Sequence, residues 1–318
     1  MAKFWEKLFG KQEKPDTEAD TIPQSPLTAI MPVTEEVTKP LSPQSSVVLP
    51  LEGETSRLGL DPPQLIACCA QSVGRQRDHN EDALFSLTTT MACNGGNIPF
   101  GLYIVADGMG GHQHGEIASE TGIRAMSEHI LTKLYLRLIS TDPQPADEPL
   151  REILQEGVQL AHEAILENVT GGGTTLTTIV VLSNRMTIAH VGDSRVYSVS
   201  INGRMKPLTR DHSLVRRLEE LGQLTPEEAA IHPQRNVLYR ALGQGEPFEP
   251  EIITAPLPQP GYLLVCSDGL WGVVPEERMG EIIKSAPQLS QACQGLVDAA
   301  NAAGGPDNIS AILVRLPE

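Results

Sequence analysis

Aromatic residues are scarce in this sequence, and long hydrophobic runs are absent. Phe, Trp and Tyr supply only 4% of the 318 residues, whereas hydrophobic residues as a whole supply 40%. Aliphatic side chains must therefore fill most of any core. No apolar run reaches the roughly 18 residues that a membrane-spanning helix needs, so we expect no transmembrane segment.

Cysteine is also sparse, and its arrangement does not indicate a disulfide framework. The number is odd, no C-x-x-C motif occurs, and the residues are Cys68, Cys69, Cys93, Cys266 and Cys293. Cys68 and Cys266 lie in apolar runs typical of strands, so we interpret them as small core residues. This usage favours a reducing compartment, and we predict a cytoplasmic location.

Positive charge is in the minority, with 24 Lys and Arg residues against 40 Asp and Glu residues and a net charge of -16. This balance argues against a nucleic-acid-binding protein with a broad basic face. The length and the charged fraction of 20% are ordinary for a soluble protein of one or two domains. Acidity favours solubility, and it also suits a site that gathers cations.

Residues 1–60 contain little that can build a core. Residues 1–10, MAKFWEKLFG, are amphipathic but lack the apolar region and cleavage site of a secretory signal. Peripheral contact with a membrane, docking on a partner and a helix too short to persist alone all fit them. Residues 11–60 are rich in Pro, Ser, Thr, Gln and Glu, which predicts a disordered linker.

Residues 61–318 carry the patterns of one folded domain. Strands are predicted at 64–73, 82–87, 98–107, 174–183, 185–192, 194–200, 251–257, 261–268 and 308–316. Helices are predicted near 150–168, 275–284 and 288–303, and also after Gly111, with these inner positions: Ile117, Met126, Ile130, Leu131, Leu134 and Leu138. Strands come in runs with paired helices between them, which favours an α+β fold over a doubly wound sheet.

Four acidic turns lie at the ends of apolar strands: Asn80-Glu81-Asp82, Asp107-Gly108, Ser267-Asp268-Gly269 and Pro306-Asp307-Asn308. One such turn means little, because Asp-Gly is common in turns. An aspartate that follows a buried strand projects its carboxylate from a rigid base, and a glycine after it leaves the backbone carbonyl accessible. Mg²⁺ and Mn²⁺ prefer such oxygen ligands. Together the four turns predict a site for two cations.

Six motifs that include these turns carry a family resemblance. They are Arg77-x-x-x-Glu81-Asp82-Ala83, Val105-Ala106-Asp107-Gly108-Met109-Gly110-Gly111-His112, Gly173-Thr174-Thr175, Val191-Gly192-Asp193-Ser194-Arg195, Cys266-Ser267-Asp268-Gly269-Leu270-Trp271 and Asp307-Asn308. In order and spacing they resemble the bacterial type 2C protein phosphatases, over residues 65 to 316. The resemblance implies a four-layer α-β-β-α sandwich, in which two mostly antiparallel sheets are flanked by helices and the metal site lies at one end.

The implied activity is hydrolysis of phosphoserine and phosphothreonine in proteins by a water activated between two Mg²⁺ or Mn²⁺ ions. By the same resemblance, Asp107 would bridge both metals and the Gly108 carbonyl would bind one of them. Asp268 and Asp307 would complete the other. The implied partners are phosphorylated proteins and a serine/threonine kinase, and we expect a monomer.

Four further residues take their roles from the resemblance. Glu81 and Asp82 would act near the metals, partly through metal-bound waters. Asp193 would help to hold a third, weaker metal. Arg77 would grip the substrate phosphate, for which its planar guanidinium offers two parallel donors.

The proton donor for the leaving alcohol stays open. Many eukaryotic members have a histidine directly after the Asp-Gly pair, whereas this chain has Met109, as bacterial relatives commonly do. His112 and His114 lie nearby and have a suitable ordinary pKa. A metal-bound water is the alternative, and a histidine in a glycine-rich turn more often has a structural role.

Residues 206–247 resemble the flap that lies beside the site in bacterial members. The segment holds several arginines within an acidic protein: Arg210, Arg216, Arg217, Arg235 and Arg240. One hypothesis is that they select phosphopeptides with acidic or phosphorylated flanks. The other is that they form a solvated helical surface.

Other classes of protein fit the sequence less well. A catalytically silent relative would bind phosphopeptides or a partner, but the intact acidic turns argue against it. A Ca²⁺-binding structural domain lacks its D-x-D-x-D-G loop. Enzymes with a serine or cysteine nucleophile lack G-x-S-x-G and C-x5-R.

Overall fold

A computed structural model of the protein describes residues 62–93, 96–110, 113–141, 148–245 and 249–317. The amphipathic segment 1–10, the linker 11–60 and His112 lie outside these ranges, so their predicted roles stay predictions. Within the described ranges, no helix has the length and apolar character required to cross a membrane.

Two five-stranded antiparallel sheets form the centre of the fold. One has the order β1 (Ile66–Ser72), β12 (Ile309–Arg315), β11 (Gly261–Cys266), β8 (Arg195–Ser200) and β9 (Met205–Pro207). The other has the order β10 (Glu251–Pro256), β7 (Arg185–Val191), β6 (Leu176–Leu182), β3 (Gly96–Ala106) and β2 (Ala83–Cys93). A two-stranded ladder joins β4 (Gly108–Met109) to β5 (Gly173–Thr174). Because β1 pairs with β12, the two ends of the domain close into one sheet.

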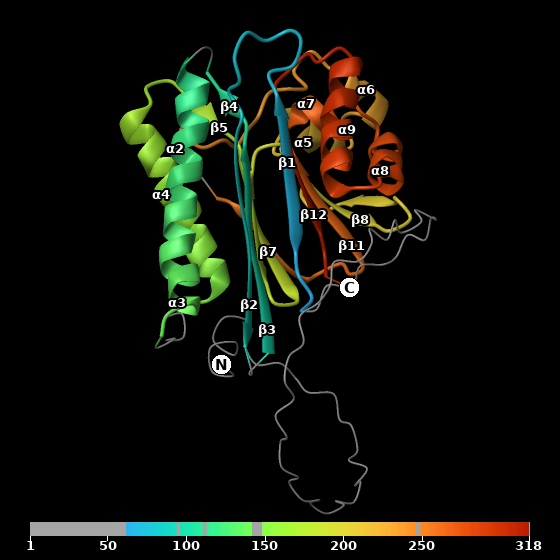
Figure 1. Ribbon diagram of the computed structural model, residues 1–318. Coiled ribbons are helices and arrows are strands. Elements are labelled where there is room, and N and C mark those ends of the chain that lie inside the picture. The colour runs from blue at the N-terminus through green and yellow to red at the C-terminus, as the bar shows by residue number, and fades with distance from the viewer. Residues whose placement is uncertain (1–61, 94–95, 111–112, 142–147, 246–248, 318) are drawn as a thin grey trace, which may run out of the picture. The chain divides into compact units, whose positions relative to one another are not determined.

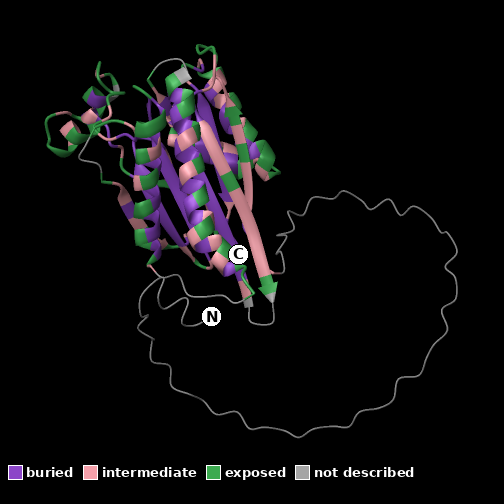
Figure 2. Cartoon of the chain, turned by 90° about the vertical axis from the view of Figure 1, so that its left-hand side faces the viewer, coloured by how far each residue is buried: buried purple, intermediate pink, exposed green. Residues whose placement is uncertain are grey.

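Helices cover the outer faces of both sheets (Figure 1). One side carries α2 (Gln113–Ile130), the π-helical turn η1 (Leu131–Tyr135), α3 (Leu136–Leu138) and α4 (Leu150–Asn168). The other carries α7 (Asp268–Trp271), α8 (Glu276–Ser285) and α9 (Leu289–Ala302). Figure 2 shows buried strands behind the exposed outer surface of the first helical layer. The four layers confirm the predicted α-β-β-α sandwich.

Strand alternation explains how one strand serves two cores. Along β3, Leu102 and Ile104 pack toward the α2–α4 layer, while Tyr103 and Val105 pack between the sheets. Successive side chains of a strand point to opposite faces, so a strand buried on both faces reads as a continuous apolar run. β3 therefore ends in a firmly held position, directly before Asp107.

Three details differ from the sequence-based expectations. Ile117 was expected on the inner face of its helix but is 46% exposed, because the neighbouring Ala118 faces the core instead. Cys266 is buried as expected, whereas Cys68 is only partly buried. β2 runs to Cys93, well past Leu87, because Thr88–Met91 pair with residues 98–101 in a long hairpin.

Candidate metal centre and phosphate site

The backbone of Asp107 is fixed by the Gly173-Thr174-Thr175 motif. The Asp107 N–H donates to the Thr175 Oγ1 at 2.9 Å, and the Thr175 N–H donates to the Asp107 carbonyl at 2.9 Å. The Thr174 hydroxyl donates to the same carbonyl, also at 2.9 Å. Two consecutive threonines thus hold the turn that follows β3, which gives the motif a local function.

The next residue, Gly108, lies in a space that a side chain could not enter. A Cβ at this position would lie 2.3 Å from the Gly115 carbonyl oxygen and 2.5 Å from that of Glu81. The Gly108 N–H donates to the Glu81 carbonyl at 3.2 Å, and the Ser119 hydroxyl donates to the same oxygen at 2.6 Å. Close backbone approach therefore requires glycine here, and it couples the Glu81 turn to the Asp107 turn.

Asn308 connects the remaining turns from the far end of the chain. Its Oδ1 accepts from the Glu81 N–H at 2.8 Å, while its Nδ2 donates to the carbonyls of Val73 and His79 at 2.8 and 2.9 Å. Asn308 is a buried residue, with a relative exposure of 4%. The sequence placed Asn308 in a motif without revealing this bridging role, because its partners lie more than 220 residues away.

Ser267 holds the Asp82 side chain by a hydrogen bond. The Ser267 hydroxyl donates to Asp82 Oδ2 at 2.8 Å and accepts from the Ser310 N–H at 3.0 Å. It orients the carboxyl of Asp82 but leaves the second oxygen open. Among the described residues, neither Asp82 Oδ1 nor Asp268 Oδ1 has a hydrogen-bond partner, and both atoms are buried.

The acidic groups lie close enough to disfavour one another's charge. Burial raises the pKa of Asp82 to about 7, with further repulsion from Asp268 and Asp307. Burial raises the pKa of Asp268 to about 6, again with repulsion from Asp307. Burial followed by repulsion from Asp82 raises the pKa of Asp107 well above its ordinary value. Buried carboxyls with unpaired oxygens are a costly arrangement that a hard cation would relieve.

Asp193 joins this group from a different strand end. Burial and then Asp268 raise the pKa of its carboxyl well above the ordinary range. Asp193 also appears among the groups that raise the pKa of Asp107. Five turns that are distant in sequence therefore share one electrostatic environment.

The carboxylates do not already form a compact ligand set. Within the described ranges, no three His, Cys, Asp or Glu side chains are grouped as a ready cation site. Glu81 is engaged by a neighbouring side chain, since its Oε1 lies 3.3 Å from the His79 Nε2. The unpaired oxygens of Asp82 and Asp268 fit hard cations, which prefer oxygen ligands. Ligation by these residues stays a prediction.

Arg77 reaches the same place from the segment after β1. Its Nη2 donates to Asp307 Oδ2 at 2.8 Å. Burial lowers the pKa of Arg77, but Asp307, Glu81 and Asp107 together outweigh that effect and raise it. The Arg77 side chain is about half exposed, so its remaining donors can reach a ligand from solution.

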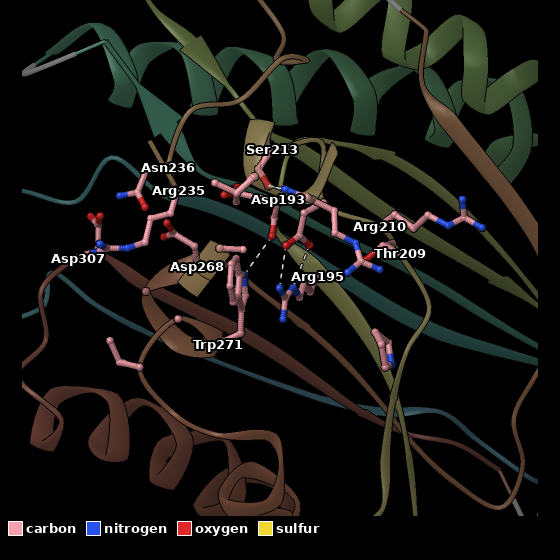
Figure 3. Close-up of a pocket in the computed structure, with 18 of the residues that line it drawn as sticks. Asp193, Arg195, Thr209, Arg210, Ser213, Arg235, Asn236, Asp268, Trp271 and Asp307 are labelled. Carbon is pink, nitrogen blue, oxygen red and sulfur yellow. Dashed lines mark hydrogen bonds and ion pairs between the residues drawn. The ribbon is translucent and has the colours of Figure 1, made fainter. Parts of the chain in front are cut away.

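A cavity of about 740 Å³ opens beside these residues. Figure 3 shows Asp307, Asp268 and Asp193 in a row, with Arg235, Asn236 and Ser213 of the flap above them. Asp82 and Asp107 do not line this cavity. The cavity thus has Asp193, Asp268 and Asp307 on one side and the flap on the other.

The flap, residues 206–247, contains α5 (Leu214–Glu220) and α6 (Pro226–Ala230). Three of its five arginines line the cavity: Arg210, Arg216 and Arg235. Arg216 is ion-paired with Glu219 at 2.7 Å, and Arg217, outside the cavity lining, lies 3.4 Å from Glu220. Within the described residues, Arg210 and Arg235 have no acidic partner at ion-pair distance.

Two cavity residues acquire roles that the sequence did not reveal. Arg195 holds Asp211 through two hydrogen bonds of 2.9 and 2.7 Å. Its guanidinium also stacks on Trp271, 3.6 Å from the ring centroid. Trp271 in turn donates from Nε1 to the Asp193 carbonyl at 3.0 Å. This wall of the cavity is therefore rigidly connected to the Asp193 turn.

The structure constrains the choice of proton donor. Met109 lies in β4, paired with Gly173. His114 Nδ1 lies 2.7 Å from the Thr170 carbonyl, to which it must donate. That bond gives His114 a structural use, whereas His112 lies outside the described residues.

Comparison with known proteins identifies a family and several relatives that this chain resembles. The family model described as "Protein phosphatase 2C" matches residues 66–309. The chain is 38% identical over 246 residues to the serine/threonine phosphatase stp of Listeria innocua, covering 76% of this chain and 92% of that protein. It is 34% identical over 251 residues to protein phosphatase PhpP of Streptococcus pneumoniae, covering 77% and 95%.

Solved structures agree in architecture. The Mycobacterium tuberculosis serine/threonine phosphatase PstP/Ppp matches with a TM-score of 0.66 and 31% identity, covering 80% of this chain and all of that one. The catalytic domain of the serine/threonine phosphatase PstP, described as a complex with two manganese ions, matches with a TM-score of 0.64 and 30% identity. It covers 80% of this chain and 99% of that one.

Proposed function

Because this chain belongs to the protein phosphatase 2C family, we propose that its acidic turns hold the divalent cations on which its activity depends. The chain is a metal-dependent protein-serine/threonine phosphatase that hydrolyses phosphoserine and phosphothreonine in proteins. The observation that supports the site assignment is the shared burial and mutual repulsion of carboxyls with unpaired oxygens, on turns within the matched range.

Two cations would share the centre. Asp107 would contact both, the Gly108 carbonyl would contact one, and Asp268 with Asp307 would hold the other. Glu81 and Asp82 would act through intervening waters. When bound, such a pair of cations lowers the pKa of a water and neutralises charge on the phosphate. The cations would be Mg²⁺ or Mn²⁺, since all these ligands are oxygens.

Asp193 would hold a third, weaker cation. It lines the cavity beside Asp268, whereas Asp82 and Asp107 do not. Its carboxyl is repelled mainly by Asp268, so a cation between the two groups would relieve that repulsion. We propose that this cation adds to the two-cation centre without replacing either member.

Arg77 would bind the substrate phosphate. Its guanidinium is already at the acidic end of the cavity, held by Asp307. A cation that bound Asp307 would free the planar donors of Arg77 for two phosphate oxygens. One acidic residue would thereby serve first as the holder of Arg77 and then as a metal ligand.

The flap would select the substrate. Arg210 and Arg235 line the cavity and have no acidic partner at ion-pair distance among the described residues. A phosphopeptide with an acidic or phosphorylated flank would supply that partner. Phosphorylated proteins, among them a serine/threonine kinase, are the proposed substrates of a monomeric cytoplasmic enzyme.

Metal dependence supplies the test of the site assignment. The purified full-length protein should hydrolyse p-nitrophenyl phosphate with added Mn²⁺ or Mg²⁺, and EDTA should stop the reaction. Asp268→Asn should bind less Mn²⁺ in calorimetry, while Asp298→Asn, on the exposed side of α9, should bind as the wild type does. Unchanged Mn²⁺ binding in Asp268→Asn would remove that residue from the centre. A protein that binds Mn²⁺ and phosphopeptides without turnover would instead be a silent relative.

A further inference from the structure

Two segments of the flap, at His212 and at Tyr239, are joined by a backbone hydrogen bond. The His212 N–H donates to the Gly192 carbonyl at 2.7 Å, and the His212 carbonyl accepts from the Tyr239 N–H at 3.0 Å. Two residues further on, the Leu214 N–H donates to the Val237 carbonyl at 2.8 Å. These two segments of the flap are therefore bonded together, and the first is bonded to the turn that carries Asp193.

The side chain of His212 makes a second bond to that turn. His212 is 4% exposed, and its Nδ1 accepts from the Gly192 N–H at 3.2 Å. Both backbone polar groups of Gly192 are thus satisfied by His212. Gly192 has a φ of 107°, and a Cβ there would lie 2.5 Å from Thr175 Cβ. The turn adopts a conformation reserved for glycine, and His212 holds it there.

The hydrogen bonds fix the protonation of His212 and of its neighbour His190. An imidazole that accepts at Nδ1 carries its proton on Nε2, and a second proton would set one N–H against another. His190 donates from Nε2 to the Arg210 carbonyl at 2.9 Å and accepts at Nδ1 from the Thr177 hydroxyl at 2.9 Å. The two rings lie 4.9 Å apart. Burial lowers the pKa of His212 to about 3 and that of His190 to about 4, so both stay neutral near pH 7.

The opposite side of the same turn is held by Trp271, which donates to the Asp193 carbonyl at 3.0 Å. Asp193 therefore lies between the base of the flap and the Trp271 wall of the cavity. Ser213, the residue after His212, lines that cavity together with Asp193. Movement of the flap base must be transmitted to the turn, because two of the turn's backbone groups are bonded to His212.

We infer that His212 is a positioning residue. Through its bonds to Gly192, the position of the flap determines the position of the Asp193 carboxylate. The inference rests on the proposed role of Asp193 as a metal ligand. The inference requires a hydrogen-bond acceptor on the side chain of residue 212, at the position that Nδ1 occupies. A residue that only filled space would be replaceable by any side chain of similar volume.

Two substitutions in the full-length protein separate these roles. His212→Phe keeps an aromatic ring but removes the acceptor, whereas His212→Asn loses the ring and places Oδ1 about where Nδ1 was. The matched control is His232→Phe, because His232 also accepts a backbone N–H through Nδ1, from Gln234 within the flap, but does not line the cavity. Thermal unfolding establishes that each variant is folded.

The readouts are the Mn²⁺ concentration for half-maximal activity and the weakest Mn²⁺-binding step in calorimetry. Loss of a partner that orients a metal ligand typically costs about 10- to 100-fold in affinity. We expect about a tenfold weaker final Mn²⁺ step in His212→Phe, substantial recovery in His212→Asn and no change in His232→Phe. Adding His212→Phe to Asp193→Asn should weaken that step no further.

The outcomes separate the two proposals. If Asp193→Asn leaves the weakest Mn²⁺ step intact, the assignment of Asp193 as a ligand fails and the coupling through His212 fails with it. If Asp193→Asn abolishes that step while folded His212→Phe retains it, the ligand assignment stands and the positioning role of His212 is wrong. Equal losses in His212→Phe and His212→Asn would also overturn it, because the acceptor would then be irrelevant.

Discussion

The acidic turns and the flap, which share one cavity through Asp193, Asp268 and Asp307, are built in opposite ways. Asp107 follows β3, whose residues from Phe100 to Ala106 are fully buried, and its backbone is bonded to Thr174 and Thr175. The flap has two short helices, and few of its apolar side chains are buried, Val215 and Leu242 among them. Residues fixed by a two-sided core can hold charges together, whereas a lightly anchored segment can adapt to peptides of different sequence. Substitutions on the acidic side should therefore affect every substrate, whereas substitutions of the flap arginines that line the cavity should affect only peptides.

The largest expected effect is on the acidic side. Asp107→Asn removes one negative charge from the group that includes Asp82, Asp193 and Asp268. We expect kcat to fall on the order of 10³-fold or more, for p-nitrophenyl phosphate and a phosphopeptide alike. Circular dichroism and thermal unfolding should show a retained fold. If only the phosphopeptide reaction suffered, the division of labour between the two sides would be wrong.

Asn308→Ala should affect stability as well as turnover. The substitution leaves the Glu81 N–H and the carbonyls of Val73 and His79 without their side-chain partner. Unpaired buried groups cost roughly 1–3 kcal/mol each, and partial relaxation should bring the loss in unfolding free energy to about 3 kcal/mol. Urea denaturation measures it. Asn168→Ala, on the exposed end of α4, is the control and should lose less than about 1 kcal/mol.

His190 gives the contact between flap and core a pH dependence. Burial lowers its pKa to about 4 in the folded protein, below the ordinary value of about 6.5. The folded state therefore binds the proton less well than the unfolded chain, so this contribution to stability is complete above pH 6.5 and is lost as the pH falls toward 4. Between pH 7 and pH 5 the loss should be about 2 kcal/mol.

Comparison with His190→Gln isolates that contribution from those of the carboxyl groups. The raised pKa of Asp82 and of Asp268 acts in the opposite sense, since such groups gain relative stability as they are protonated. The difference in unfolding free energy between the wild type and His190→Gln should therefore shrink as the pH falls from 7 to 5. A difference that is independent of pH would show that His190 is not held neutral by the fold.

The comparison also explains which features of the fold and site could be predicted from the sequence. Patterns along the chain predicted the strand ends, the four acidic turns and the sandwich, because burial and turn chemistry leave local signals. Local signals did not predict the hydrogen bonds from Asn308 to Val73 or from Trp271 to Asp193. The partners of these bonds are 235 and 78 residues apart in the sequence. The exposure of Ile117 escaped prediction for a related reason. Helical periodicity alone did not show that Ala118, not its neighbour, would face the sheet.

Within the flap, the sequence could not rank the arginines that the structure separates. All five lie in one polar segment, yet Arg210 and Arg235 line the cavity without an acidic partner at ion-pair distance among the described residues. Arg217 lies outside the lining and near Glu220. Ion pairing between side chains is decided by the fold of the segment, so a pattern of charges along the chain does not determine it.

The smallest predicted effect is on the flap, at these arginines. Replacing Arg210 and Arg235 by Glu should raise KM for an acidic-flanked phosphopeptide about tenfold, because two attractive contacts become repulsive. Turnover of p-nitrophenyl phosphate should change less than about twofold, since that substrate has no flank to meet the flap. Arg217→Glu keeps the change of charge but not the place in the cavity, and should leave both KM values near those of the wild type. Equal increases in KM for the double variant and for Arg217→Glu would mean that the flap acts through its overall charge, and the adaptable side of the cavity would then lack a defined contact with peptide.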